Sequence, residues 1–258
     1  MKSPRTVVKS IFCFNTGRSG SAYLATILDE GRNCVSHHEP APDGFGAPLQ
    51  AFNKGDAAAM IEVARAKASQ IEEANRKDLI YAESSHCFVK GFGWPLMEMF
   101  DPATVGIIVL RRDPEKIARS MFRVGTSALS YAGRKFYLTP DRLNPAIKPP
   151  AFFGLPGRLG YETAWKASRR WQKLKRLLRV TGDPRGPFPA YQRATIDWYI
   201  KEMKALEDQF KDRYPQCSYF EIDIDMLNEA AHTQRMCDFF GVEIDARNIG
   251  ALGEPVNL

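Results

Sequence analysis

Small and basic residues form a turn after the first apolar run of the chain. Residues 16–21 read TGRSGS; they follow the run 6–15 and open an amphipathic stretch over 19–30. Glycines let backbone amides come close to a ligand, serines add hydroxyl donors, and Arg18 adds a fixed positive charge. A helix that starts there points free N–H groups and its positive dipole end into the turn. The turn therefore predicts a site for a phosphate-like anion, the alternative being a tight turn that binds nothing.

The same turn differs from a Walker A loop. It is shorter, and no lysine followed by serine or threonine closes it. A phosphate-loop kinase would also need a magnesium-binding carboxylate at a strand end, and the sequence shows no clear candidate. The kinase stays an alternative that both observations disfavour.

A second turn repeats the pattern of strand, polar turn and helix. Residues 105–122 read VGIIVLRRDPEKIARSMF, with Asp113 as the expected helix cap and a proline at the first helical position. Arg112 lies at the end of the apolar run, and Ser120 follows eight residues later. If the two apolar runs form neighbouring strands, both turns face one crevice, as a ligand with two separated phosphate groups requires. The alternative is that Arg112 only caps the turn and that Ser120 is an ordinary helical serine.

Residues that are able to accept a proton gather near the end of the second strand. Residues 33–46 read NCVSHHEPAPDGFG and hold three adjacent proton acceptors, His37, His38 and Glu39. His86, in the segment ESSHCF, is a weaker candidate. The alternative for these residues is a polar strand edge without chemistry.

Composition limits the class of protein. The chain has 258 residues, a net charge of +6, 44% hydrophobic and 26% charged residues, as in a globular protein of one large or two small domains. The positive charge indicates an anionic partner, whether nucleic acid, a phosphorylated cofactor or an acidic glycan. Five scattered cysteines without metal-site spacing favour free thiols in a reducing compartment. The apolar runs are too short for a signal peptide or a membrane span, so we predict a cytoplasmic protein.

Apolar segments alternate with helical segments through the first half of the chain. Strands are expected over residues 6–15, 33–38, 78–83, 105–110 and 217–222. Helices are expected over residues 19–30, 56–76, 114–124, 162–180 and 190–212, with a short one around 234–241. This order predicts an α/β fold, a three-layer sandwich whose central parallel sheet is covered on both faces.

The alternation stops near residue 125. Five prolines and three glycines over residues 138–160 predict a long loop, either a lid on the acceptor side or an irregular surface excursion. Seven basic residues on the helix 162–180 favour a solvated face, and they raise the alternative of a protein that binds nucleic acid or another polyanion. Residues 125–213 are interpreted as a loop and helical insertion.

The ordered segments resemble the PAPS-dependent sulfotransferases, where PAPS is 3′-phosphoadenosine-5′-phosphosulfate. TGRSGSAYLATIL is similar to the family's 5′-phosphosulfate loop, R-S-G-[ST]-x-x-L, and LRRDPEKIARS to its 3′-phosphate motif, R-[DN]-P with a serine eight residues after the arginine. YAESSHCFVKGF and YFEIDIDMLNEAAHTQRMCDFFGV are similar to later parts of family members. The resemblance covers roughly residues 8–40, 78–123 and 214–242. It implies a P-loop NTPase-like fold and one sulfotransferase domain over 1–258.

The resemblance also implies an activity and a set of site residues. A sulfuryl group would move from PAPS, leaving 3′-phosphoadenosine-5′-phosphate (PAP), to a hydroxyl of a carbohydrate or small molecule, which can be anionic. The implied cofactor-binding residues are Thr16, Gly17, Arg18, Ser19, Gly20, Ser21 and Ala22 at the 5′ end, and Arg112 and Ser120 at the 3′-phosphate.

The catalytic residues follow from the same resemblance. Arg18 stands where many cytosolic members have lysine, which matches the arginine form of other branches, and it is implied in catalysis. Glu39 is the implied base because carboxylate-using members have a similar segment in this place, and His38 is its rival. Neither a metal nor a nucleic-acid partner is expected, and the acceptor and the oligomeric state stay open.

Overall fold

The structure is a computed structural model that describes residues 7–124, 126, 128, 130, 133–150 and 190–245. Its strands are β1 (Ser10–Phe14), β2 (Cys34–His37), β3 (Ile80–Glu83), β4 (Val105–Arg111) and β5 (Ser218–Asp223). Its α-helices are α1 (Ser21–Asp29), α2 (Ala47–Asn53), α3 (Ala58–Asn75), α4 (Gly93–Met97), α5 (Pro114–Val124), α7 (Ala190–Arg213) and α8 (Ala230–Phe240). Short 3-10 turns lie at Pro102–Thr104, Gly133–Lys135 and Ile224–Asn228.

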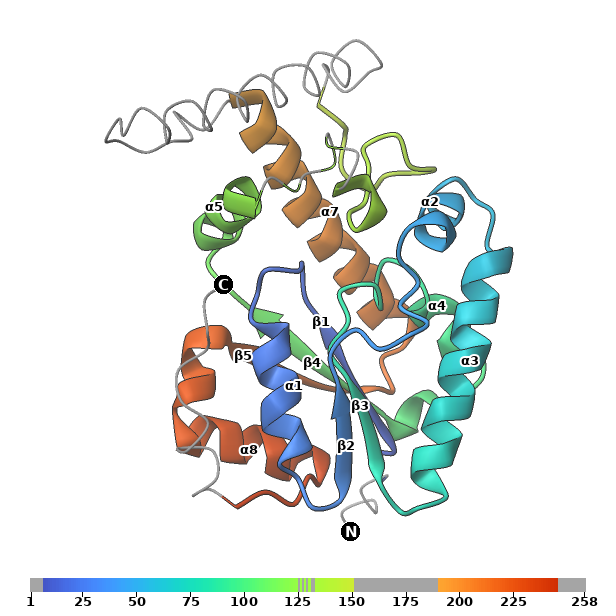
Figure 1. The fold of residues 1–258 in the computed structure, drawn as a ribbon, viewed down its shortest axis with the longest axis vertical. Coiled ribbons are helices and arrows are strands. Elements are labelled where there is room, and N and C mark those ends of the chain that lie inside the picture. The colour runs from blue at the N-terminus through green and yellow to red at the C-terminus, as the bar shows by residue number, and fades with distance from the viewer. Residues whose placement is uncertain are drawn as a thin grey trace, which may run out of the picture.

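The five strands form one parallel sheet in the order β2-β3-β1-β4-β5 (Figure 1). The prediction of a central parallel sheet built from these five segments is confirmed. The chain crosses from β1 to the edge strand β2 on one side, and after β3 it crosses past β1 to β4 on the other. Such a change of direction beside the central strand is the position at which open α/β sheets bind ligands.

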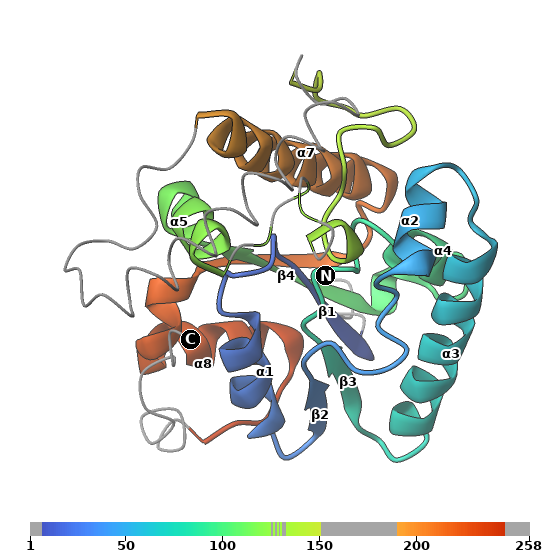
Figure 2. The ribbon, with the colours of Figure 1, turned by 45° about the horizontal axis from the view of Figure 1, so that its top comes forward.

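Alternate side chains of the central strand enter two different cores. Phe12 and Phe14 pack with residues of α3, α4 and α7, whereas Ile11 and Cys13 pack with residues of α1 and α8. None of these four residues is more than 1% exposed. Burial on both faces explains why β1 is a continuous apolar run instead of an alternating one. The views in Figures 1 and 2 show helices on both sides of the sheet, which makes the fold an α/β sandwich.

Helix α7 is one of the elements that cover the sheet. Trp198, Tyr199, Met203 and Phe210 are at most 3% exposed and belong to the same core as the β1 phenylalanines. The ring of Phe210 meets that of Phe14 edge to face, with centroids 5.3 Å apart. The sequence interpretation placed residues 190–212 in an insertion, and the structure makes this helix part of the sandwich.

Further predictions concern the short helices, the cysteines, the segments after residue 150 and membrane spans. The sequence patterns missed α2 and α4, which have seven and five residues and are too short to show a helical period. All five cysteines are buried and free, as predicted. The loop residues 151–160 and the helix 162–180 lie outside the described residues. No helix in the described ranges combines the length and apolarity that a membrane crossing needs.

Candidate functional site

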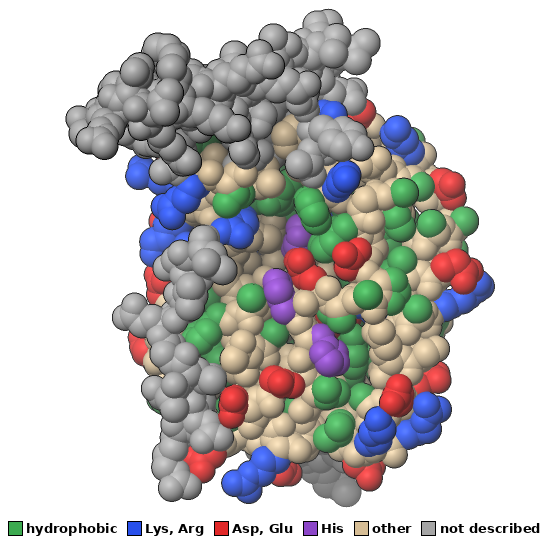
Figure 3. All heavy atoms as spheres, in the orientation of Figure 1, with side chains coloured by type: hydrophobic (Ala, Val, Ile, Leu, Met, Phe, Trp, Pro, Cys, Tyr) green, Lys and Arg blue, Asp and Glu red, His purple; other side chains and the backbone are tan. Residues whose placement is uncertain are grey.

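The candidate site lies where the carboxyl ends of four neighbouring strands meet. The β1–α1 turn (residues 15–20) leaves β1 there, Glu39 follows β2, His86 follows β3 and Arg112 follows β4. Because these strands are parallel neighbours, their ends bring the four segments to one edge of the sheet. Figure 3 shows histidine side chains in the middle of this face, with lysine and arginine side chains on the side of α5.

The β1–α1 turn has a backbone that few residue types adopt. Its φ angles are +75° at Gly17, +57° at Arg18 and +84° at Gly20. The hydroxyl of Tyr199, on α7, donates to the Thr16 carbonyl at 2.8 Å and ties the turn to the helix layer. This hydrogen bond from α7 therefore helps to fix the conformation of the β1–α1 turn.

Two buried donors of this turn have no hydrogen-bond partner in the described part of the chain. They are Ser19 Oγ and Asn15 Nδ2, on residues that are each 1% exposed. Asn15 uses its other amide atom, Oδ1, to accept the Gly17 N–H at 2.9 Å. Helix α1 begins at Ser21, and no side chain caps its N-terminus. Because buried donors without acceptors are costly, a ligand that brings oxygen acceptors, such as a phosphate group, fits this turn.

Gly20→Ala is expected to lower the free energy of unfolding by more than the roughly 1–2 kcal/mol that a left-handed conformation costs an L side chain. Gly20 has a φ of +84°, and a Cβ there would lie 2.3 Å from Ile224 Cδ1. Urea denaturation measures the change. Gly241→Ala is the control, because Gly241 has nearly the same left-handed backbone, with φ +78° and ψ +22°, and its Cβ would meet no atom within 4 Å. A loss at Gly20 no larger than that at Gly241 would contradict a role for the Ile224 contact.

Residues of the two predicted phosphate turns meet directly. Arg18 Nε donates to Ser120 Oγ on α5 at 3.1 Å, and the Arg112 guanidinium donates to the Arg18 carbonyl at 2.5 Å. The sequence prediction placed Arg18 at one end of the ligand and Ser120 at the other, and the structure pairs them with each other. The two turns thus build one site, while the role of its residues in binding a cofactor stays a prediction.

Glu39 lies on the turn after β2, with its carboxylate against His86. Its Oε1 is 3.2 Å from His86 Nε2, and its side chain is 27% exposed, which leaves it accessible to a ligand. Burial raises the pKa of Glu39, while positive charge at His38 and Lys90 lowers it. A carboxylate with a raised pKa suits a general base that works near neutral pH.

Helix α3 fixes the backbone beside this carboxylate. Glu39 has a φ of +48°, a left-handed conformation that its neighbours have to maintain. Lys67 Nζ donates to the Pro40 carbonyl at 2.7 Å, and Gln70 Nε2 donates to the Ala41 carbonyl at 2.9 Å. The position of Glu39 is therefore determined by side chains that sequence patterns did not connect with it.

His38 is oriented by Ser84, the residue after β3. Its Nδ1 lies 3.0 Å from the Ser84 carbonyl, and a carbonyl can only accept, so Nδ1 carries the proton and Nε2 of the neutral ring is left as an acceptor. The Ser84 hydroxyl donates to the Ser21 carbonyl at the start of α1 at 2.7 Å. His38 is thus connected to the β1–α1 segment and could also take a proton. His37, the last residue of β2, is exposed.

Two buried residues that the sequence prediction missed connect Glu39 with the β1–α1 turn. Lys90 is 1% exposed, and its Nζ lies 2.5 Å from His86 Nδ1 and 3.3 Å from the Tyr199 hydroxyl. Tyr199 in turn donates to the Thr16 carbonyl. The one sequence signal was a lysine inside the apolar segment CFVKGF, and nothing marked Tyr199.

Burial determines the charge states in this chain of contacts. Burial and the nearby Lys90 charge hold the pKa of His86 well below its usual range, so His86 is neutral near pH 7. Burial also lowers the pKa of Lys90 to about 7, against a weaker opposing effect of the Glu39 charge. Lys90 is therefore a lysine that gains or loses its proton near neutral pH.

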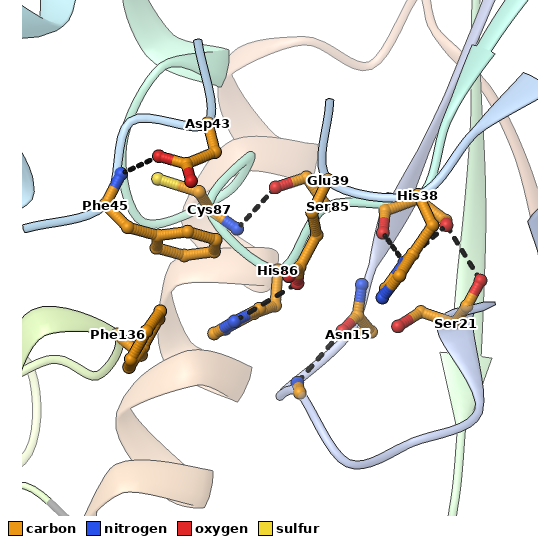
Figure 4. A network of polar contacts seen from close by, with 12 residues as sticks. Asn15, Ser21, His38, Glu39, Asp43, Phe45, Ser85, His86, Cys87 and Phe136 are labelled. Carbon is orange, nitrogen blue, oxygen red and sulfur yellow. Dashed lines mark hydrogen bonds and ion pairs between the residues drawn. The ribbon is translucent and has the colours of Figure 1, made fainter. Parts of the chain in front are cut away.

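Aromatic side chains form an apolar wall next to Glu39. The ring centroid of Phe45 lies 4.6 Å from that of His86 and 5.3 Å from that of Phe136. Phe136 is 38% exposed, so part of the wall faces the outside. Figure 4 shows His86 between Glu39 and these two phenylalanine rings.

The structure gathers the predicted site residues at this edge of the sheet. They are Thr16, Gly17, Arg18, Ser19, Gly20, Ser21 and Ala22 in the turn and the start of α1, Arg112 and Ser120 beside it, and His38 and Glu39 after β2. In the described ranges, no group of three or more His, Cys, Asp or Glu is placed to hold a metal ion. In the comparison with known proteins, no family model and no curated protein matches the chain. A functional conclusion therefore has to come from the geometry of the site and the motifs.

Proposed function

We propose that this protein is a sulfotransferase that moves a sulfuryl group from PAPS to a hydroxyl of an acceptor. The observation that carries the proposal is the contact of Arg18 with Ser120, together with that of Arg112 with the Arg18 carbonyl. Residues that match both cofactor motifs thus share one site. A nucleotide with phosphate groups at its 5′ and 3′ positions has the two separated anions that such a site can hold.

The donors of the site fit the anionic ends of this nucleotide. Ser19 Oγ and Asn15 Nδ2 are buried without partners in the described residues, beside the uncapped N-terminus of α1. Arg18 and Arg112 add two guanidinium groups, which bind phosphate oxygens in a fixed geometry. The parallel sheet with this turn after its central strand also supports a P-loop NTPase-like fold.

Arg18, Glu39 and His38 are the side chains with a role in the transfer step of the proposed reaction. PAPS supplies a sulfuryl group bonded to a phosphate that leaves with negative charge. Arg18 and the N-terminus of α1 stabilise that charge. Glu39 takes the proton of the acceptor hydroxyl, and its backbone bonds to α3 keep the carboxylate in place. His38, with Nε2 as acceptor, is the other candidate base.

The wall beside Glu39 indicates which acceptors fit. Phe45 and the partly exposed Phe136 offer an apolar surface within the same site. A carbohydrate or a small ring compound presents a hydroxyl next to such a flat apolar face. We therefore propose an acceptor of this class.

Calorimetry with three ligands tests the proposal on the wild-type protein. We expect PAP to bind at least about tenfold more tightly than ATP with magnesium, a difference of about 1.4 kcal/mol, because a site with two anion positions gains from the 3′-phosphate. A random single-stranded oligonucleotide should bind more weakly than PAP at physiological salt. Tighter binding of ATP with magnesium would favour the kinase, and tighter, steeply salt-dependent binding of the oligonucleotide would favour the polyanion-binding protein.

A further inference from the structure

Lys90 is a buried lysine whose ammonium group has one acceptor for each of its three hydrogens. Its Nζ lies 2.5 Å from His86 Nδ1 and 3.3 Å from the Tyr199 hydroxyl, and it donates to the Phe136 carbonyl. It also lies between 5.5 and 5.6 Å from the centroids of three aromatic rings. A buried ammonium group is stable only where its donors are satisfied, and these contacts satisfy them.

The Lys90 contact determines which nitrogen of His86 carries a proton. An ammonium group only donates, so Nδ1 has to accept, and the single proton of the neutral ring is on Nε2. That nitrogen lies 3.2 Å from Glu39 Oε1, so its N–H faces a carboxylate oxygen. The positive charge stays on Lys90, and His86 is neutral and donates its Nε2–H to the Glu39 carboxylate.

The His86 ring is confined in this orientation. A Cβ on Gly17 would lie 3.3 Å from His86 Nδ1, so the β1–α1 turn passes close to the ring. The Phe45 ring lies on another side, with a centroid distance of 4.6 Å (Figure 4). His86 itself is 6% exposed. The orientation of the ring is therefore set by packing, and its proton pattern by Lys90.

We propose that Lys90 is a positioning residue for Glu39, because its ammonium group holds His86 as a neutral donor of the Nε2–H bond to the carboxylate. This inference rests on the proposed function in so far as Glu39 is the base. The proton pattern of His86 does not depend on it.

The reason is the charge that His86 would otherwise take. Without the Lys90 charge, an imidazole beside a carboxylate gains a second proton more easily, and the imidazolium would then pair with Glu39. A carboxylate paired with a charge at this distance is a weaker base. The other charged or titratable groups around this contact are His38 and Asp43 on the segment after β2, Glu83 on β3, Cys87 next to His86, and Tyr137 and Tyr199. Among them Glu83 is paired with Lys67 at 2.9 Å.

The influence of Lys90 on the protonation of His86 should be present at low pH and lost at high pH. Burial lowers the pKa of Lys90 to about 7, so its charge is present below that pH and is lost above it. A variant without the charge should therefore differ from the wild type most clearly below pH 7, and the difference should fade as the pH rises.

Nitrogen NMR of the histidine rings in wild-type and Lys90→Met protein tests the proposal. In the wild type below pH 7 we expect Nε2 of His86 to be protonated and Nδ1 to be unprotonated. In Lys90→Met we expect Nδ1 to gain a proton as the pH falls, with the pKa of His86 raised by about one unit or more. The same proton pattern and pKa in both proteins would overturn the proposal. If Lys90→Met does not fold, a protonated Nδ1 in the wild type below pH 7 overturns it alone.

Lys90→Arg is the matched control, because a guanidinium group keeps the positive charge and can only donate. His86 should stay neutral in this variant, and an imidazolium there would also contradict the proposal. In an enzymatic assay below pH 7, Lys90→Met should lower kcat about tenfold, part of the ~10²–10⁴-fold that a general base supplies, with the KM for PAPS nearly unchanged. Wild-type protein that does not bind PAP would refute the sulfotransferase and leave the His86 measurement standing.

Discussion

Arg112→Ala should weaken the binding of PAP at least about 100-fold, because two charge-assisted hydrogen bonds of about 1.5–3 kcal/mol each would be lost and each 1.4 kcal/mol is a factor of ten. Arg112 follows β4 and donates to the carbonyl of Arg18. The same loss is expected for Arg18→Ala, since its guanidinium lies on Ser120 in the shared site. Isothermal titration with PAP at fixed ionic strength measures both.

Arg119→Ala provides the control for these two variants. Arg119 is on α5 with Ser120, but its side chain is 73% exposed and pairs with Glu115 at 2.7 Å. The substitution Arg119→Ala also removes one positive charge, and it leaves the site itself unchanged. The affinity of this variant for PAP should therefore stay within about twofold of the wild type, as for a screened surface charge. If Arg112→Ala binds PAP as tightly as Arg119→Ala does, the shared site is not the nucleotide site.

Glu39→Gln should lower turnover by about 10²–10⁴-fold, the usual contribution of a general base, and leave the affinity for PAP unchanged. The amide has nearly the same shape as the carboxylate, and the Lys67 and Gln70 bonds to the neighbouring carbonyls do not involve the altered group. Transfer of labelled sulfate from PAPS to a panel of hydroxyl acceptors measures turnover. In the wild type, the activity should fall with decreasing pH at a higher pH than a free carboxylate would give, because burial raises the pKa of Glu39.

His38→Gln separates the two candidate bases. It removes the nitrogen that could take a proton at Nε2 and keeps a side chain that can bond to Ser84. We expect this variant to keep most of the activity. Full turnover in Glu39→Gln, with loss in His38→Gln, would transfer the role of base to His38.

Local sequence patterns were sufficient for the elements that hold the site. The strands β1, β3 and β4 are buried almost throughout, so their apolar runs are visible without tertiary information, whereas the edge strands β2 and β5 are only partly buried. The start of α5 was visible too, since Asp113 Oδ1 accepts the N–H of Glu115 at 2.6 Å and Pro114 opens the helix. The glycine turn after β1 was found because positive φ angles limit which residues can form it.

The contacts inside the site depend on distant parts of the chain and escaped prediction. Arg18 and Ser120 are 102 residues apart. The sequence prediction gave each of them a contact with the ligand and did not predict their contact with each other. Lys90 and Tyr199 are 109 residues apart, and only the packing of α7 on the sheet brings them together. A helix pattern shows that a tyrosine is on an apolar face and does not show which buried cation it meets.

The most direct measurement compares PAP with adenosine 5′-monophosphate on wild-type and Arg112→Ala protein by calorimetry. If Arg112 and Ser120 bind the 3′-phosphate, the wild type should bind PAP about 100-fold more tightly than the monophosphate, a difference of about 2.8 kcal/mol. Arg112→Ala should bind both ligands with similar affinity. A wild-type protein that does not distinguish the two nucleotides, or a variant that keeps the full preference for PAP, would contradict a site built from both turns.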